Sequence, residues 1–284
     1  MEEKLYELLD FAISKKCSDI HLILKNDQVK ISLRYEECLE EYDKSYPKNF
    51  INYLAYKANL DLGTNNKMQS GMFDYYYEYE YFAIRFSLIN SLQLVSGVIR
   101  ILNTTKYQSL YSLTLNETMT SKLLSLTCLN YGLVLICGPT GSGKTTTLYA
   151  LAHSFKGKMV YSIEDPIEIY NDDFIQLQIN EKMGITYQSG IKQIMRHDPD
   201  IIVIGEIRDK QAAMMACNAA LTGHLVLATI HGKTGKGVYQ RLLDFDINED
   251  DIKEVLKEVV VQQLVYDQKN KRRVASILFE KFSD

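Results

Sequence analysis

The sequence predicts an α/β protein, in which a domain with a mostly parallel sheet follows a smaller α+β domain. From Leu113 onward, short apolar runs alternate with helical stretches, a pattern typical of a parallel sheet with helices on both faces. One of these runs leads directly into a glycine-rich segment with the spacing G-x-x-x-x-G-K-[ST]. The first hundred residues lack this alternation and predict a separate unit.

Residues 1–103 form the smaller predicted domain. Apolar residues at helical spacing predict a helix over residues 1–14, and a second helix is expected over 51–60, with Leu62-Gly63 as its stop. The expected strands are 19–24, 29–35, 75–79, 81–88 and 95–102, with a turn at 25–27. A cluster of tyrosines at 75–81 suits strands, so we prefer this interpretation to base stacking.

Residues 104–112 are the predicted linker, because the chain around them has turn residues and no firm period. The larger domain is then 113–284. Its expected strands are 132–136, 159–163, 174–177, 201–204 and 225–229.

Composition narrows the function classes. The 284 residues carry a formal net charge of −4, which provides no general basic field for nucleic acid. The five cysteines are scattered and form no C-x-x-C pair, so we expect reduced cytosolic thiols and no zinc, with Cys137 as a small core residue. No apolar run is long enough to span a bilayer, so any membrane association is expected to be peripheral.

The segment 138–147 follows an apolar strand and precedes a helical stretch that we expect over 146–155. Glycines allow the backbone to turn successive N–H groups toward a phosphate, and the helix start adds further N–H groups and a positive dipole end. Lys144 can reach the β- and γ-phosphates of ATP, Thr145 can bind Mg²⁺, and Thr146 can contact the α-phosphate. The alternative, a glycine turn that only joins strand to helix, is weaker. The predicted nucleotide-binding residues are Gly138, Pro139, Thr140, Gly141, Ser142, Gly143, Lys144, Thr145 and Thr146.

Carboxylates follow two other predicted strands. Glu206 comes just after the run 201–204, where it can hold the Mg²⁺ shell through water and polarise the attacking water. Glu164, Asp165 and Glu168 follow the strand that ends at Ile163. They are either site carboxylates or a helix-cap cluster, since Asp165-Pro166 resembles a cap followed by proline at the first helical position.

Histidines flank the last predicted strand. His231 lies just beyond its carboxyl end, where we expect a nucleotide- or interface-sensing role, whereas His224 precedes it and is expected to brace a neighbouring loop. The other three histidines are interpreted as structural.

Together, several motifs resemble those of the secretion ATPase family that drives type II secretion and type IV pili. They are CSDIHL (17–22), GPTGSGKTTT (138–147), IEDPIE (163–168), RHDPDIIVIGEIRD (196–209) and TGHLVLATIH (222–231). The resemblance implies a hexameric motor whose subunits have a PAS-like N-terminal domain and a RecA-like ATPase domain. IEDPIE is similar to the family's Asp box, GEIRD to its Walker B segment and TGHLVLATIH to its His box.

The same resemblance implies roles for further residues. Arg85 in YFAIRFS and Arg100 in GVIRIL are similar to arginines that the family brings to a neighbour's nucleotide. A planar cation suits the charge that develops on phosphate. Glu206 and Glu164 both remain candidates for the general base.

Departures from the family pattern narrow the comparison. Assembly ATPases of Gram-negative pili and type II systems usually carry an extra N-terminal domain and a four-cysteine zinc subdomain. We expect neither here, because the sequence has no C-x-x-C pair and CSDIHL begins only sixteen residues in. The compact ending looks more like competence-pilus assembly ATPases of Gram-positive bacteria. The segment GKTGKG (232–237) departs from the usual His-Thr-Asn continuation and leaves the contacts after His231 open. The segment 138–145 has the spacing of a phosphate-binding loop (P-loop). The different spacing of glycine and lysine in GKTGKG excludes a second P-loop there.

The resemblance thus implies an ATP-hydrolysing homo-hexamer that powers assembly of a competence type IV pilus and works with a polytopic inner-membrane pilus platform protein. We expect it in the cytoplasm, peripheral on the inner face of the cell membrane, with no direct nucleic-acid binding. The alternatives are a pilus retraction motor and a nucleotide-gated scaffold with little turnover; a DNA-pumping motor is less favoured.

Overall fold

The protein is described here by a computed structural model. It describes residues 1–35, 38–61, 68–78, 80–90, 95–103, 109–114, 116–169, 171–268 and 272–280, excluding the side chains of residues 103, 182 and 272. The chain divides into two compact units, Met1–Thr104 and Thr105–Asp284. No helix among the described residues combines the length and the apolar character that crossing a membrane requires.

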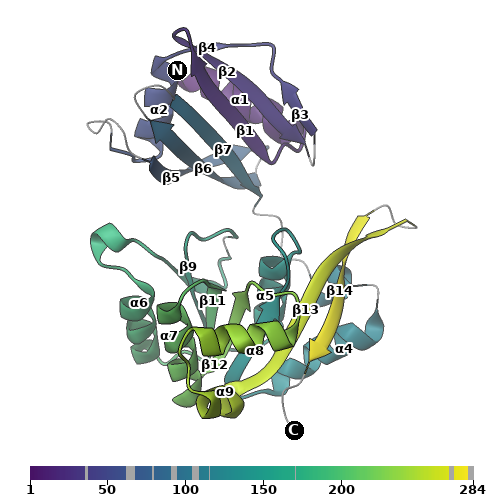
Figure 1. The fold of residues 1–284 in the computed structure, drawn as a ribbon. Helices are drawn as coiled ribbons and strands as arrows, with labels where there is room; N and C mark the ends of the chain where they lie inside the picture. The colour runs from purple at the N-terminus through teal and green to yellow at the C-terminus, as the bar shows by residue number, and fades with distance from the viewer. Residues whose placement is uncertain are drawn as a thin grey trace. The chain divides into compact units, whose positions relative to one another are not determined.

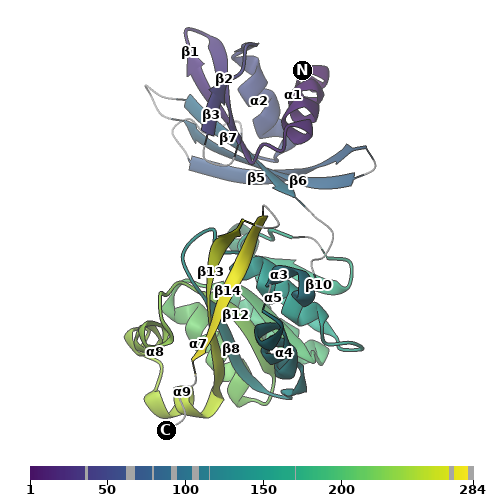
Figure 2. The same cartoon turned by 90° about the vertical axis from the view of Figure 1, so that its right-hand side faces the viewer.

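The N-terminal unit is an antiparallel sheet with two helices on one face (Figure 2). The strand order is β3-β2-β1-β7-β6-β5, and β4 pairs with β2. The elements are α1 (Glu2–Ser14), β1 (Asp19–Lys25), β2 (Gln28–Tyr35), β3 (Cys38–Glu41), β4 (Tyr46–Pro47), α2 (Asn49–Lys57), β5 (Met68–Tyr77), β6 (Glu80–Asn90) and β7 (Val95–Asn103).

Hydrophobic spacing explains the core of this unit. The predicted apolar stripe of α1 is confirmed, since Leu5, Leu8, Leu9 and Ala12 are fully buried. They pack with the apolar face of α2 against alternate residues of the sheet, which belong to the same core cluster.

The first turn and the second helix of the N-terminal unit both have local signals in the sequence. The predicted turn between the first strands is confirmed, with Asn26 and Asp27 at φ of 51° and 58°, the left-handed conformation of a tight hairpin. The helix predicted over 51–60 begins at Asn49 and ends at Lys57, because the chain turns at Asn59 with φ of 55°. The proposed stop at Leu62-Gly63 lies outside the described residues.

The C-terminal unit contains a seven-stranded sheet of order β10-β9-β11-β12-β8-β13-β14 (Figure 1). The strands from β10 to β13 are parallel, and β14 alone is antiparallel to its neighbour, so the prediction of a mostly parallel sheet is confirmed. Its strands are β8 (Gly132–Cys137), β9 (Val160–Glu164), β10 (Phe174–Gln178), β11 (Ile201–Ile207), β12 (Leu225–Ile230), β13 (Leu256–Asp267) and β14 (Arg272–Glu280).

Helices cover both faces of this sheet, as predicted. Figure 2 shows α3, α4 and α5 on one side and α7, α8 and α9 on the other. The α-helices are α3 (Leu110–Leu113), α4 (Glu117–Ser125), α5 (Lys144–His153), α6 (Tyr187–Ile194), α7 (Lys210–Leu221), α8 (Gly235–Asp244) and α9 (Glu249–Val255). Among the described residues of this unit, short 3-10 helices span Leu126–Cys128, Glu181–Met183 and Met195–His197.

The central strands are continuous apolar runs because both of their faces are buried. Along β8, Leu133 and Leu135 belong to one core cluster, whereas Val134 and Ile136 belong to the cluster on the opposite face. Helix α3 begins at Leu110, where the sequence predicts linker, because Ser109 caps it and Leu110 is buried in the second cluster.

Candidate functional site

The glycine-rich segment forms a tight loop between β8 and α5. Gly143 has φ of +80°, a conformation that favours glycine, and it directly precedes the first helical residue. Gly138 tolerates no side chain for a different reason, since a Cβ there would lie 2.1 Å from the carbonyl oxygen of Gln262. The helix begins without a side-chain cap, so its first N–H groups stay available to a ligand.

The side chain of Lys144 folds back onto the backbone at the start of the loop. Its ammonium Nζ donates to the carbonyl oxygens of Gly138, at 3.1 Å, and Pro139, at 3.0 Å. Burial lowers the pKa of Lys144, and the charges of Glu206 and Glu168 act in the opposite direction. Both carboxylates are therefore within electrostatic reach of the lysine.

Strands β9, β11 and β12 end at the same edge of the sheet as the loop. Because β8, β9, β11 and β12 are parallel, their carboxyl ends meet there. Strand β12 lies between β8 and β11, so the His231 that follows it stands between the loop and the strand of Glu206. The structure thus gathers residues that are far apart in the sequence.

Glu206 lies at the centre of a charged cluster at this edge. Its Oε1 is 2.8 Å from His231 Nε2, and its Oε2 accepts from Arg208 Nε. Arg208 also lies 3.7 Å from Asp165, which links the predicted Asp box to the GEIRD segment. Glu206 belongs to β11 rather than to a loop after it, at a bulge where Thr229 Oγ1 donates to the carbonyl of Gly205 at 2.6 Å.

Glu164 has a different environment. It is the last residue of β9, is only 2% exposed, and accepts hydrogen bonds from Tyr149, Ser162 and Gln176. Burial raises its pKa, although these donors oppose the shift. In this conformation its carboxylate belongs to a buried network beneath α5.

The helix-cap alternative for Asp165-Pro166 is wrong. The peptide bond between these residues is cis, and residues 165–169 form no helix. Because no helix follows Asp165 among residues 165–169, Asp165 does not cap a helix start.

Arg85 and Arg100 lie in the N-terminal unit, directly opposite each other on β6 and β7. Arg100 Nε donates to Asp19 Oδ1 at 2.7 Å. Asp19 is only 6% exposed, so this motif residue of CSDIHL serves as an anchor for Arg100. Sequence reasoning missed the anchor, because the two residues are far apart in the chain.

The segment after His231 forms the start of α8. Thr234 Oγ1 accepts from the N–H of Gly237 at 3.1 Å, and the N–H of Gly235 donates to the Glu280 carboxylate at 2.9 Å. The anion at this helix start is therefore an internal carboxylate. His224, at the other end of β12, contacts Thr222 at 3.1 Å.

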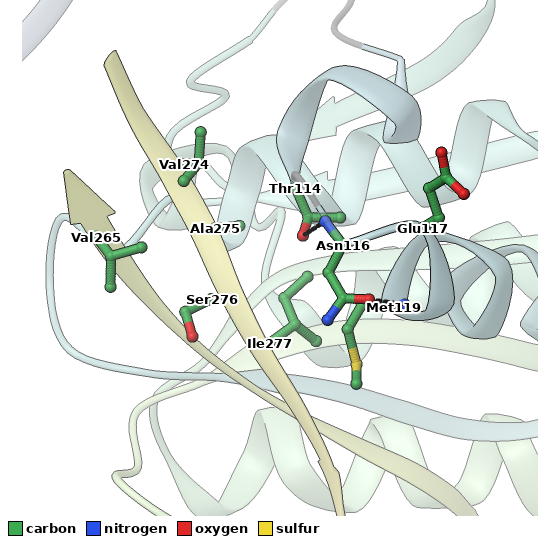
Figure 3. A pocket seen from close by; sticks show the side chains of 9 residues that line it. All are labelled: Thr114, Asn116, Glu117, Met119, Val265, Val274, Ala275, Ser276 and Ile277. Atoms are coloured by element: carbon green, nitrogen blue, oxygen red, sulfur yellow. Dashed lines mark hydrogen bonds between the residues drawn. The ribbon is translucent and has the colours of Figure 1, made fainter. Parts of the chain in front are cut away.

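A groove of about 560 Å³ lies apart from these residues, between the start of α4 and the β13–β14 hairpin (Figure 3). Two of its polar residues are engaged locally, since Asn116 caps α4 and its N–H donates to Thr114 Oγ1. No P-loop residue lines it, so we do not place the nucleotide there. The lining residues are Thr114, Asn116, Glu117, Met119, Val265, Val274, Ala275, Ser276 and Ile277. Across the described part of the chain, no three His, Cys, Asp or Glu residues group as metal ligands.

A parallel sheet that carries this loop and an acidic strand end at one edge is the arrangement of P-loop NTPases. The family model described as "Type II/IV secretion system protein" matches residues 1–281, and the chain belongs to this family. Solved structures similar to this chain include a pilus retraction motor and a bacterial ATPase.

Proteins with similar sequences include competence and type II secretion proteins. The competence protein ComGA of Bacillus subtilis is 36% identical over 264 residues, covering 91% of this chain and 74% of the relative. ComGA of Streptococcus pneumoniae is 36% identical over 270 residues, with 93% and 85% coverage. The putative type II secretion system protein E of Escherichia coli is 31% identical over 264 residues, covering 91% of this chain and 54% of that protein.

Solved structures show the same fold. The crystal structure of the pilus retraction motor PilT with bound ADP matches with a TM-score of 0.78 and 25% identity, over 96% of this chain and 82% of that one. The Legionella pneumophila ATPase DotB matches with a TM-score of 0.75 and 22% identity, over 99% and 81%.

Proposed function

We propose that this protein is an ATP-hydrolysing subunit of a hexameric motor that powers assembly of a competence type IV pilus. The observation that carries the proposal is the loop around Lys144, with Glu206 and His231 at the same sheet edge. The similarity to two ComGA proteins supports the competence assignment. The ADP bound to PilT supports nucleotide as the ligand.

The residues at the loop fit ATP and Mg²⁺. The loop has a buried ammonium, an uncapped helix start, and a Ser142 hydroxyl that is buried without a partner among the described residues. Thr145 and Thr146 lie half-buried on the first turn of α5. Thr145 would hold Mg²⁺ directly and Glu206 through water; the ion would neutralise charge on the phosphates.

Glu206 is the preferred general base. It is 18% exposed and belongs to the cluster that acts on Lys144, whereas Glu164 is enclosed by its donors. His231 would sense the state of the nucleotide through its contact with Glu206. Glu164 remains the second candidate for the base, because it ends the strand beside that of Glu206 at the same edge of the sheet.

The remaining proposals concern assembly. The N-terminal unit would be a PAS-like domain and the C-terminal unit a RecA-like domain, and Arg85 and Arg100 would act on a neighbouring subunit's nucleotide. ATP turnover would bias a two-state arrangement of the domains and transmit motion to a polytopic membrane platform protein. The motor would be cytoplasmic and peripheral on the inner face of the membrane.

Variants of Lys144 and Glu206 test the activity. We expect Lys144→Ala to lose nucleotide binding, and Glu206→Gln to bind ATP but hydrolyse it at least about 100-fold more slowly, because the proton acceptor is lost. Steady-state ATPase assays and calorimetry with ADP measure the two effects. Lys192→Ala, at an exposed lysine of α6, is the matched control and should behave as wild type. Full turnover in Lys144→Ala or Glu206→Gln would refute the assignment, and negligible turnover by the wild type would favour the scaffold alternative.

Retraction is the second candidate, because PilT is a retraction motor of the same fold. Deleting the gene separates the two directions of work. Loss of surface pili, counted by electron microscopy, supports assembly, whereas an excess of pili supports retraction.

A further inference from the structure

Gln262 on β13 lies against the back of the P-loop. Strand β13 runs parallel to β8, with Val261 opposite Cys137, so the next residue comes beside the start of the loop. The contact is close, since the backbone oxygen of Gln262 leaves no room for a Cβ at Gly138. Its side chain is 1% exposed.

The side-chain amide of Gln262 forms a hydrogen bond with the Ser142–Gly143 peptide of the loop. Its Nε2 donates to the carbonyl oxygen of Ser142 at 2.6 Å. A Cβ added to Gly143 would lie 3.1 Å from this Nε2 and 3.7 Å from Leu264 Cδ2, so β13 forms a wall behind the Ser142–Gly143 peptide.

The orientation of that peptide decides where a phosphate-binding donor points. In a planar trans peptide, the C=O and the following N–H point in opposite directions. With the Ser142 carbonyl held toward Gln262, the Gly143 N–H is turned away from the Gln262 side chain. P-loops bind phosphates through such backbone N–H groups.

We propose that Gln262 is a positioning residue for the nucleotide: it locks the Ser142–Gly143 peptide so that the Gly143 N–H faces the β-phosphate. This inference rests on the proposed ATP site and adds a residue that lies outside every motif of the sequence. A flexible loop would have to order this peptide at the moment of binding, and Gln262 removes that cost beforehand.

Gln262→Met tests the proposal, because methionine has a similar length and cannot donate a hydrogen bond. Gln263→Met is the matched control, since Gln263 is the neighbouring glutamine on the same strand and its side chain is exposed. By isothermal titration calorimetry, we expect Gln262→Met to bind ADP about 10-fold more weakly, the usual worth of one charge-assisted hydrogen bond. AMP, which lacks the β-phosphate, should bind both variants equally, and Gln263→Met should bind ADP as wild type does.

A spectroscopic arm distinguishes positioning from a general loss of structure. In ¹⁵N-glycine-labelled wild type, ADP should shift the amide resonance of Gly143, and the shift should shrink in Gln262→Met. If Gln262→Met melts without nucleotide at a clearly lower temperature than wild type, Gln262→Leu replaces it, because leucine also lacks a hydrogen-bond donor and introduces no charge beside the phosphate.

The outcomes separate the two levels of inference. A wild type that does not bind ADP would overturn the proposed function itself. A wild type that binds ADP without any response of Gly143, or a folded Gln262→Met with unchanged ADP affinity, would overturn the role of Gln262 alone.

Discussion

Two glutamates at the ends of adjacent strands show how environment divides roles among identical residues. Glu206 faces Arg208 and His231, whereas Glu164 is enclosed by the hydroxyls of Tyr149 and Ser162. Gly205 permits the close packing of the two strand ends, since a Cβ there would lie 2.9 Å from Glu164 Cγ. A partly buried carboxylate beside an arginine and a histidine, and a fully buried one held by neutral donors, are suited to different tasks.

The buried carboxylate of Glu164 makes stability depend on pH. Burial raises its pKa above the ordinary value of 4.5, so the folded state binds this proton more tightly than the unfolded state does. The contribution of Glu164 to stability is therefore full below 4.5 and is lost as the pH rises through the raised pKa. We expect the stability of Glu164→Gln relative to wild type to increase with pH, because glutamine carries no charge to bury.

Urea unfolding of the nucleotide-free protein at about pH 5 and about pH 8 measures this difference. Glu254→Gln, at an exposed glutamate of α9, is the control and should show no such trend. A stability difference for Glu164→Gln that is constant across this range would contradict the burial argument.

At the scale of elements, strong hydrophobic periodicity was enough to predict the central strands and α1. The predicted ends of β9 and β11 were too early in the chain, because a glutamate after an apolar run resembles the start of a loop. Strand β13 was not predicted, although Val259, Val260 and Val261 form an apolar run, because the polar Gln262 and Gln263 interrupt it. That omission also hid Gln262, whose role depends on a partner 120 positions away.

The start of helix α7 is stabilised by a residue of one of the family motifs. Asp209, the last residue of the GEIRD segment, accepts from the N–H of Ala212 at 2.8 Å and caps the helix. We expect Asp209→Ala to lower the free energy of unfolding by about 1 kcal/mol, because the first turn loses its acceptor. Asp209→Asn should retain most of the stability, since asparagine is an equally good cap.

Chemical denaturation without nucleotide measures the cap. An Asp209→Asn variant as unstable as Asp209→Ala would show that charge, rather than the hydrogen bond at the helix start, stabilises this end of α7.

At the scale of the whole molecule, topology explains why motifs spread over the chain converge. Parallel strands bring their carboxyl ends to one edge, so a sequence that places the P-loop, Glu206 and His231 after apolar runs already predicts their proximity. Contacts that cross between strands without such a rule, such as Asp19 with Arg100, were beyond sequence reasoning. The arginines themselves were found only through resemblance to a family.

The proposed action of these arginines on a neighbouring subunit predicts complementation. Arg85→Ala and Lys144→Ala should each abolish turnover, the first by removing the cation and the second by disabling the P-loop. Arg85 is preferred to Arg100 here, because loss of Arg100 would leave the buried Asp19 carboxylate without the cation that pairs with it. In oligomers assembled from equal amounts of both variants, about a quarter of the interfaces would pair an intact P-loop with an intact arginine.

We therefore expect the co-expressed mixture, purified through two different tags, to recover up to about a quarter of wild-type ATPase activity, since closed symmetric rings contain such heterologous interfaces. The matched control is a mixture of Lys144→Ala with Glu206→Gln, in which both defects lie at the same sheet edge and no interface regains a complete site. An arginine that served its own subunit's nucleotide would leave both mixtures equally inactive, because every subunit would carry one defect. The difference between the two mixtures thus measures whether the site is completed across subunits.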